Sequence, residues 1–390
     1  MTLHSAGRSA AVYESGDVHR IPWPETDDGR FARAYLEPIL RHGTESVAAN
    51  VKAQMGVVIV GEHVIPFSVS SEAPDQSYVV SPRTHYITYG QEEIGKLRAP
   101  VLEHGLRAIV SRLGTQFEQA GFDRVVYVNN WLLSTNLYPR WTREHALAVR
   151  DALIERYPDR AVVFRSVDRR VNHNLERWLL EAGAHPVFSR RVLFQEPASE
   201  RVQSRRDFRR DAELLRKTIA KGTYRIVKTY ELTDEQLDRV AELYDLLYIQ
   251  KWSRHNPQLT RSYVRRVLKG DVFPGQALVS PTGRVDAAYG AWSRAGLFCV
   301  PILGYDIHAP QRIGLYRMIS AMNSREAIER NALVHDSAGA SDFKQHRGAE
   351  PVLEHQMVFD AHLPFSRRPW RVLGALMRHL GVPLIERFNL

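Results

Sequence analysis

Short apolar runs alternate along this 390-residue chain with segments in which hydrophobic residues recur every three or four positions. The runs are typical of buried strands, and the longer spacing is typical of helices that bury one face. Both patterns are clearest over residues 100–194 and 223–360. Strands that alternate with helices predict an α/β fold whose sheet contains parallel pairs.

The later stretch predicts its elements in a definite order. A strand at 224–230 precedes a helix that Thr233 and Gln236 begin with a capping box, and a second helix follows at 260–268. Three strands joined by tight turns come next, and then a helix, a strand, a short helix and a final strand. We expect these later elements at 277–280, 285–292, 297–305, 314–331, 333–336, 342–346 and 352–360.

The earlier part of the chain is less regular. Residues 1–30 are polar and are interrupted by Pro22 and Pro24, which predicts a flexible lead-in. The helices expected after it lie at 31–40, 100–120 and 172–182, and Thr142 caps another whose apolar positions are Ala146, Val149 and Leu153. The strands expected among them lie at 57–60, 64–69, 78–80, 85–89, 124–128, 161–164 and 186–194.

Residues 197–222 form the most charged segment. Positions 201–221 hold eight Lys or Arg residues against three acidic residues. Four of the basic residues fall on one stripe of an expected helix: Arg206, Arg210, Lys217 and Lys221. The stripe is explained either by a solvated connecting helix or by a surface that contacts RNA phosphates. We expect this segment to join two domains, 31–196 and 223–390, the second ending in an amphipathic helix.

Composition narrows the function only a little. The net charge of +9 favours a polyanionic partner such as a nucleotide cofactor or RNA, although solubility alone would also explain it. The single cysteine, Cys299, lies in an apolar run, so we expect a core residue and no cysteine catalysis. The 16 histidines form no metal-binding motif, so no metal is expected. The chain lacks a run of eighteen apolar residues and an apolar signal sequence, so we expect a cytoplasmic protein.

Residues 332–350, ALVHDSAGASDFKQHRGAE, carry the most informative motif. An apolar strand ends at Asp336, small residues form a turn, and Phe343-Lys344 opens a basic segment. Small residues let a backbone approach a ligand closely, and a helix N-terminus offers free N–H groups to an anion. A carboxylate at a strand end is explained equally well by a general base and by a helix N-cap.

This motif and the order of the elements around it resemble the GNAT superfamily, in particular its double-domain Fem-like and BioF2-like branch. The resemblance is strongest over residues 223–362. A degenerate copy over 45–195 would make the chain a tandem of GNAT-like domains, each a mixed central sheet flanked by helices. In Fem-like aminoacyl transferases a matching Phe-Lys pair lies near the transfer centre, which implies catalytic roles for Phe343 and Lys344. A cation placed there stabilises the charge that develops on an ester carbonyl under attack, and Asp336 would serve as the base or bind the acceptor.

The resemblance also implies residues that hold the acyl donor. In acetyl-CoA-dependent GNAT enzymes the backbone of a Gln/Arg-x-x-Gly-x-Gly/Ala motif binds the pyrophosphate of coenzyme A. Here Gln311, Arg312 and Gly314 match that motif, but Tyr316 stands at its last, small position, where a ring would crowd a phosphate. Two further donor-binding candidates lie in the 332–350 segment, at Ser337 and Arg347.

The acceptor is expected on the other side of the transfer centre. GNAT domains shape the acceptor site with the loop between their first two helices, which here contains Tyr248, Lys251 and Trp252. Tyr305 and Asp306 end the strand next to that loop and are further candidates for binding the acceptor.

Three functions follow from this resemblance. The leading hypothesis is a transferase, as in natural-product assembly, that moves an aminoacyl group from aminoacyl-tRNA to an amine, hydroxylamine or hydroxyl of a small acceptor. Seryl-tRNA is among the candidate donors, the transfer would be direct and would need no cofactor, and the basic stripe would contact the tRNA. The alternative is an N-acyltransferase of the same fold that uses a coenzyme A thioester. A third hypothesis is a non-catalytic pair of GNAT-like domains that binds RNA.

Overall fold

The computed structural model of the chain describes residues 10–94 and 100–383, and its central feature is a 12-stranded mixed sheet. Along the sheet the strands follow the order β1-β2-β3-β4-β5-β12-β6-β11-β10-β9-β8-β7. Their bounds are β1 Ala11–Glu14, β2 Ala53–Val60, β3 His63–Ser70, β4 Val125–Val128, β5 Ala161–Asp168, β6 His185–Gln195, β7 Arg225–Lys228, β8 Gly275–Val279, β9 Val285–Arg294, β10 Leu297–Tyr305, β11 Leu333–His335 and β12 Glu350–Phe359.

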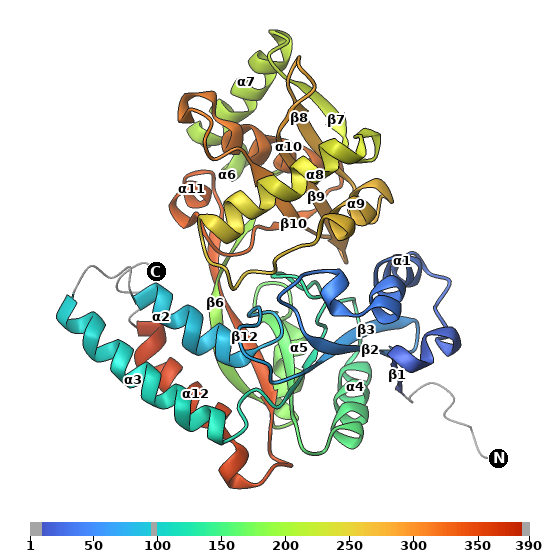
Figure 1. Cartoon of the computed structure of the whole chain (residues 1–390), viewed down its shortest axis with the longest axis vertical. Helices are drawn as coiled ribbons and strands as arrows, with labels where there is room; N and C mark the ends of the chain where they lie inside the picture. Colours follow the sequence, from blue (N-terminus) through green and yellow to red (C-terminus); the bar gives the residue numbers. More distant parts are fainter. Residues whose placement is uncertain (1–9, 95–99, 384–390) are drawn as a thin grey trace.

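Helices cover the sheet along its length (Figure 1). Their bounds are α1 Asp27–His42, α2 Tyr89–Ile94, α3 Pro100–Gln119, α4 Arg143–Arg156, α5 His173–Glu181, α6 Glu200–Gln203, α7 Arg206–Ala220, α8 Asp234–Tyr244, α9 Arg261–Lys269, α10 Leu315–Glu329, α11 Ser341–His346 and α12 Pro369–Leu376. Two π-helical segments, η3 (Thr84–Thr88) and η5 (Asp245–Gln250), and the 3₁₀ turn η6 (Gln311–Ile313) matter for the site described below.

The two halves of the chain exchange strands at the middle of the sheet. The last strand, β12, lies between β5 and β6 of the first half, and β6 in turn pairs with β11 of the second half. Figure 1 shows β6 and β12 side by side at the junction of the halves. Because each half supplies a strand that the other half needs, the sheet continues without a break across the expected domain boundary.

The two parallel strand pairs occupy corresponding places in the halves. In the first half β4 pairs with β5, and in the second half β10 pairs with β11. The second pair is short, because only Leu297 and Phe298 pair with residues of β11, whereas β10 continues to Tyr305. The chain after β11 is therefore not hydrogen-bonded to the end of β10, and the motif of residues 336–347 lies there.

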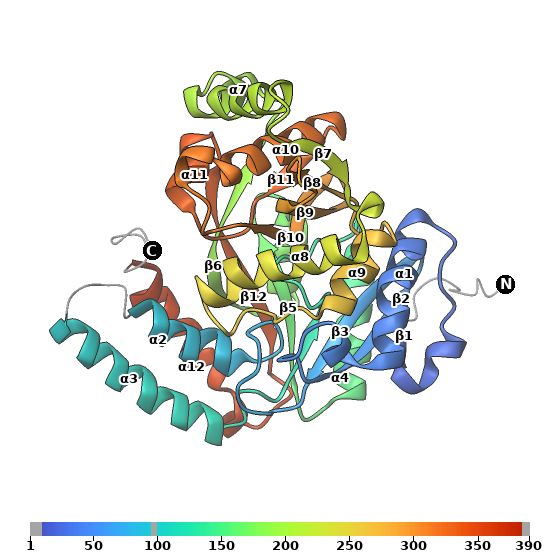
Figure 2. The ribbon, with the colours of Figure 1, turned by 45° about the horizontal axis from the view of Figure 1, so that its top comes forward.

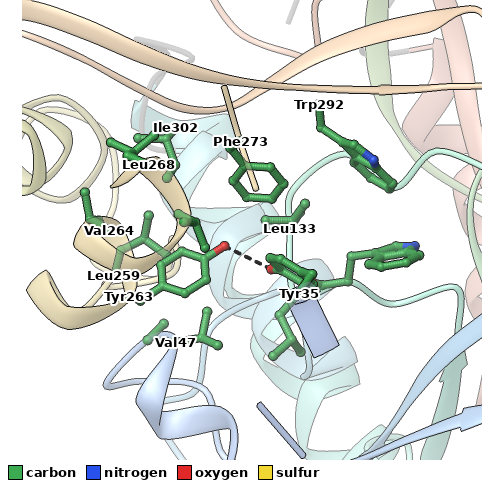
Figure 3. Packing of buried hydrophobic residues seen from close by; sticks show 14 of the residues in the cluster. Tyr35, Val47, Leu133, Leu259, Tyr263, Val264, Leu268, Phe273, Trp292 and Ile302 are labelled. Atoms are coloured by element: carbon green, nitrogen blue, oxygen red, sulfur yellow. Dashed lines mark hydrogen bonds between the residues drawn. The ribbon is translucent and has the colours of Figure 1, made fainter. Parts of the chain in front are cut away.

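One hydrophobic cluster joins the halves. It packs α1 and the loops at Val47 and Leu133 against α9 and the strands of the second half (Figure 3). At its centre the hydroxyls of Tyr35 and Tyr263 lie 2.9 Å apart, and the Tyr35 hydroxyl donates to the carbonyl of Trp131 at 2.8 Å. The hydrogen-bonded hydroxyls satisfy polar atoms that would be costly to bury alone.

The elements predicted for the second half are confirmed within a few residues. The capping box of Thr233 and Gln236 begins α8, and the three-strand meander, α10, β11, α11 and β12 follow in the expected order. The connecting segment contains two helices instead of one, α6 and α7, and Figure 2 shows α7 lying outside α10. The predicted C-terminal helix begins at Pro369, and its last residues, 384–390, lie outside the described part of the chain.

Three predictions for the first half were wrong. The flexible lead-in expected at 1–30 is wrong over its described part, because Ala11–Glu14 pairs with β2 and α1 begins at Asp27; residues 1–9 lie outside the described residues. Residues 78–80 form no strand. They are a buried loop whose backbone binds distant carbonyls, as in the bond from the Tyr78 N–H to His255. The run at 85–89 lies in the π-helical turn η3, since so short an apolar run does not distinguish a strand from a helix.

Candidate functional site

Lys344, on α11, is buried beside the turn that follows β11, with 8% of its surface exposed. Its Nζ donates to the backbone carbonyls of Asp336 and Ala338, and it lies 3.9 Å from the Asp336 carboxylate. Burial lowers the pKa of Lys344, and the charge on Asp336 opposes that shift. The ammonium group is therefore held inside the protein, at a fixed point beside a carboxylate.

Asp336 is the more open member of this pair, since 37% of its side chain is exposed. Its crowded surroundings raise its pKa, while Lys344 lowers it. The turn after it is held by the first half of the chain: Asp336 N–H donates to the Leu193 carbonyl, and Leu193 N–H donates to the Ser337 carbonyl. Ser337 has φ +56°, a strained value that the contacts around the turn must stabilise.

A buried network of charged residues lies behind this turn. Arg190 of β6 donates to both carboxylate oxygens of Glu354 on β12, at 2.9 and 3.2 Å, and to Ser337 Oγ at 3.2 Å. His335 Nδ1 accepts the Ser337 N–H, so its Nε2 carries the proton of the neutral ring and lies 4.0 Å from Glu354. Although burial opposes it, Arg190 keeps the pKa of Glu354 below its usual range. Burial lowers the pKa of His335 to about 4.

Two histidines, His335 and His85, predict that the protein loses stability in acid. His335 is neutral in the folded protein down to about pH 4, whereas an unfolded histidine takes up a proton near pH 6.5. Between these values the unfolded state binds more protons, so the free energy of unfolding falls as the pH falls, by about 3 kcal/mol for His335 alone. His85, whose pKa burial lowers to about 3, acts in the same direction.

Urea unfolding between pH 7 and pH 4 measures this slope. We expect His335→Asn to make it shallower, whereas the control His346→Asn, at an exposed position of α11, retains it. A slope that His335→Asn leaves unchanged would contradict the assignment.

The Phe343-Lys344 pair is held in place by a second buried arginine. Arg347 donates to Asp211 of α7 at 2.5 Å and to the Phe343 carbonyl at 2.7 Å, and its guanidinium lies 3.3 Å from the centre of the Phe343 ring. The same Asp211 accepts a bond from Arg317 of α10 at 2.6 Å. A single carboxylate of the basic helix thus ties together α7, α10 and the segment that carries Lys344.

The residues expected to hold coenzyme A are arranged differently from a free phosphate-binding loop. Gln311 and Arg312 are exposed in η6, and Gly314 has φ +74°. A Cβ on Gly314 would lie 2.6 Å from Leu214 of α7, so α7 covers this turn. Tyr316 packs between two other rings, 5.4 Å from that of Tyr305 and 4.5 Å from that of Phe343. The ring of Tyr316 is thus part of the packing around the Phe343-Lys344 pair.

Most of the expected acceptor residues gather near Asp336. Lys251 Nζ lies 3.5 Å from the Tyr305 hydroxyl and 6.0 Å from the rings of Tyr305 and Trp252. The pKa of Tyr248 is raised by burial first, and also by the charges of Tyr78 and Asp336, so it lies within electrostatic reach of that carboxylate. The π-helical segment η5 brings Tyr248 here from the end of α8.

Asp306 was expected beside them but faces elsewhere. Its carboxylate accepts bonds from Arg239 at 3.2 Å and from the N–H of His308 at 3.0 Å. Adjacent residues of a strand point to opposite faces, and Asp306 directly follows β10, so its side chain faces α8 while the Tyr305 ring packs against that of Tyr316. The Asp306 carboxylate therefore joins α8, through Arg239, to the turn that follows β10.

The basic stripe lies on the exposed side of α7. Lys217 lies 3.2 Å from Glu213, and Arg206 lies 3.5 Å from Asp207, in exposed pairs that contribute little stability. Arg210 and Lys221 form no ion pair with any residue that the structure describes, and neither does the neighbouring Arg209. These three side chains are free to bind an anionic partner.

Sequence analysis missed the buried residues that hold the site together. Arg190, His335 and Glu354 come from three strands far apart in the sequence, and no local pattern brings them together. Asp211 left a weak signal, because it stands on the same stripe of α7 as the buried Leu215 and thus within the apolar face.

Other expectations concern absences. Cys299 is buried as predicted, and burial raises the pKa of its thiol. Within residues 10–94 and 100–383 no three His, Cys, Asp or Glu residues cluster as metal ligands. No described helix is long and apolar enough to span a bilayer.

Comparison with solved structures identifies the fold. The crystal structure of FemX matches with a TM-score of 0.50 over 92% of this chain and 96% of that protein, at 9% identity. The chain has a GNAT-like fold. A tandem GNAT protein from the clavulanic acid biosynthesis pathway matches over 91% of this chain and 99% of its own, with 13% identity and a TM-score of 0.40. L-PGS from Bacillus licheniformis matches over 59% and 77%, with 12% identity and a TM-score of 0.42.

The expected α/β, GNAT-like architecture, a mixed sheet flanked by helices, is confirmed, and the FemX structure shares this fold. No protein-family model matches the chain, and no curated protein matches it. At these identities the likeness shows the fold alone, so the chemistry must be argued from the site.

Proposed function

We propose that the protein transfers an aminoacyl group from aminoacyl-tRNA to a small acceptor at the Asp336–Lys344 site. The observation that carries this choice of donor is the position of α7. Leu214 lies over Gly314, and the buried carboxylate of Asp211 reaches the first turn of α10. In a coenzyme A-dependent enzyme of this fold that turn would hold a pyrophosphate, and here the side chain of Leu214 occupies the space beside it.

The chemistry fits a donor that is already activated. An amine, hydroxylamine or hydroxyl of the acceptor attacks the ester carbon, an oxyanion forms, and its collapse releases the terminal ribose hydroxyl of the tRNA. An ammonium group has three N–H donors, and two of those on Lys344 bind carbonyls, which leaves one for the oxyanion. Asp336, whose carboxylate lies 3.9 Å from Lys344 Nζ, accepts the proton that the nucleophile loses and returns it to the departing ribose oxygen.

Direct transfer requires no nucleophile from the protein. The single thiol, Cys299, has 1% of its surface exposed and lies in the core. Holding donor and acceptor together supplies most of the acceleration in such reactions, and the fixed cation supplies the rest.

The basic face of α7 supports the tRNA and provides a test. We expect the triple variant Arg209→Gln/Arg210→Gln/Lys221→Gln to bind charged tRNA more weakly. The slope of log affinity against log salt should become shallower by about 0.7–0.9 for each phosphate that the variant no longer binds. Gel retardation at several salt concentrations measures both effects. Arg33→Gln, at an exposed position of α1, is the matched control. Equal slopes for the wild type and the triple variant would show that these residues of α7 do not contact the tRNA.

The main alternative, an acyl-CoA-dependent N-acyltransferase, is distinguished by ligand binding. The proposal predicts that the protein retards charged tRNA and that coenzyme A does not raise its melting temperature. Tight coenzyme A binding without a tRNA complex would reverse the choice of donor. A protein that binds tRNA but transfers nothing would instead be the RNA-binding pair of domains.

A further inference from the structure

Arg165, near the end of β5, is a buried cation without an acidic partner. Only 4% of its surface is exposed, and its guanidinium lies 5.3 Å from the centre of the Tyr127 ring. Its Nη1 donates to Asn130 Oδ1 at 2.5 Å. No carboxylate among the described residues forms an ion pair with it. Burial lowers its pKa, as expected where a charge loses water and gains no counter-ion.

The other deeply buried arginines are paired. Arg294, 6% exposed, lies over the Trp131 ring at 5.1 Å and donates to Asp28 at 2.6 Å. Arg347, also 6% exposed, donates to Asp211. Leaving a buried charge unpaired is strongly unfavourable, so proteins rarely do so. Arg165 therefore lacks the carboxylate partner that stabilises the guanidinium groups of Arg294 and Arg347.

Arg165 occupies the place in the first half that Asp336 occupies in the second. Each directly precedes a serine with positive φ, Ser166 at +57° within β5 and Ser337 at +56° just after β11, and these are the second strands of the two parallel pairs. The pKa of Arg165 responds to Tyr78 and to the Arg190–Glu354 pair. Arg190 in turn donates to Ser337, so Arg165 is connected to the transfer site through one residue.

The charges in this interior are unevenly placed. Arg165 and Arg190 carry two positive charges, Glu354 is paired with Arg190, and the second buried carboxylate, Asp168, lies opposite Glu354 on β5 and accepts backbone N–H bonds from Arg170 and Val171. His85 and His335, which lie against the same group, are neutral near pH 7 because burial lowers their pKa values to about 3 and about 4. The guanidinium of Arg190 also faces hydroxyl groups, those of Ser337 at 3.2 Å and Thr135 at 3.5 Å. Guanidinium and hydroxyl groups together are suited to bind a carboxylate or a phosphate.

We propose that Arg165, with Arg190 beside it, binds an anionic group, a carboxylate or a phosphate, carried by the acceptor. The acceptor would then be anchored on the first half of the chain and present its nucleophile to Lys344 on the second half. The anion site stands on the burial and pairing of Arg165, whereas its assignment to the acceptor rests on the proposed function.

The first test measures stability and needs no substrate. Arg165→Gln and Arg294→Gln each remove a buried guanidinium that lies over an aromatic ring. We expect Arg294→Gln to lower the melting temperature markedly, because it leaves Asp28 unpaired, and Arg165→Gln to leave it unchanged or raise it in chloride buffer. Inorganic phosphate or acetate, at ten times its dissociation constant and constant ionic strength, should raise the melting temperature of the wild type by about 2 °C, but not that of Arg165→Gln.

The second test asks where the anion comes from. Small amines with a carboxylate, such as glycine, are compared as acceptors with their amides, such as glycinamide, in transfer from aminoacyl-tRNA. We expect Arg165→Gln to raise the KM for the acid at least tenfold and to leave the KM for the amide and kcat unchanged.

The outcomes separate the two claims. Equal destabilisation by both arginine variants, with no effect of either anion on the wild type, would overturn the anion site. Stabilisation by free phosphate without any preference for acidic acceptors would keep the site but overturn its assignment to the acceptor. If the wild type transfers nothing from aminoacyl-tRNA, the proposed function fails while the stability test still decides the anion site.

Discussion

Replacing Lys344 with methionine should lower the rate of aminoacyl transfer by about 10²–10³-fold, which corresponds to roughly 3–4 kcal/mol of transition-state stabilisation. The methionine keeps the apolar stem in its buried position and removes only the charge. Because the role proposed for Lys344 is to stabilise charge that develops in the transition state, kcat should fall and the KM for charged tRNA should change little. Single-turnover transfer from a labelled aminoacyl-tRNA measures the effect.

Two controls separate catalysis from folding. The carbonyls of Asp336 and Ala338 lose their donor in Lys344→Met, so the free energy of unfolding should also fall, by about 1–3 kcal/mol. Assays below the melting temperature of the variant remove this contribution. Lys251→Met, at an exposed position beside Trp252, should affect the KM for the acceptor and not the rate of the chemical step. Unchanged turnover in Lys344→Met would end the catalytic assignment of this residue.

Replacing Asp211 with asparagine should cause the largest loss of stability, about 3–5 kcal/mol. The side chain is 2% exposed, and its two oxygens accept bonds from Arg347 and Arg317. Asparagine has nearly the same shape but leaves two cations beside a neutral amide. Since Arg347 also holds Phe343, transfer activity should fall together with stability.

The matched control for Asp211 lies two residues away on the same helix. Glu213 is solvent-exposed, and its bonds to Arg216 and Lys217 lower its pKa to about 2. Water already solvates these charges, so Glu213→Gln should leave the free energy of unfolding almost unchanged. Urea unfolding of both variants makes the comparison. Equal effects at the two positions would show that Asp211 does not anchor α7.

Lys344 shows how much of the site local sequence could predict. The order of elements around it, the small-residue turn and the Phe343-Lys344 pair were readable because each depends on neighbours within a few residues. The surroundings of Lys344 were not. The turn that its ammonium group binds is held by Leu193 and Arg190 of β6, a strand of the first half that reaches β11 only in the shared sheet.

Two aspartates show the two kinds of error that arise when a site is predicted from local sequence: Asp306 was assigned to the site but faces away from it, and Asp211 was overlooked. Asp306 was expected at the site because it follows the right strand, but strand alternation and Arg239 turn it away. Asp211 was passed over as one acid among many basic residues, yet it is the residue that fastens α7 to the catalytic segment.

The sequence by itself determined the local elements of this protein: the capped helices, the meander of the second half, the basic stripe of α7, and the core position of Cys299. These follow from spacing, turn chemistry and hydrophobicity within short windows. Only the tertiary structure decided that the halves share one sheet and one core, that α7 covers the turn at Gly314, and that Arg165 stays without a counter-ion. Such features depend on contacts between residues a hundred or more positions apart, and their energies of burial and pairing exist only once those residues meet.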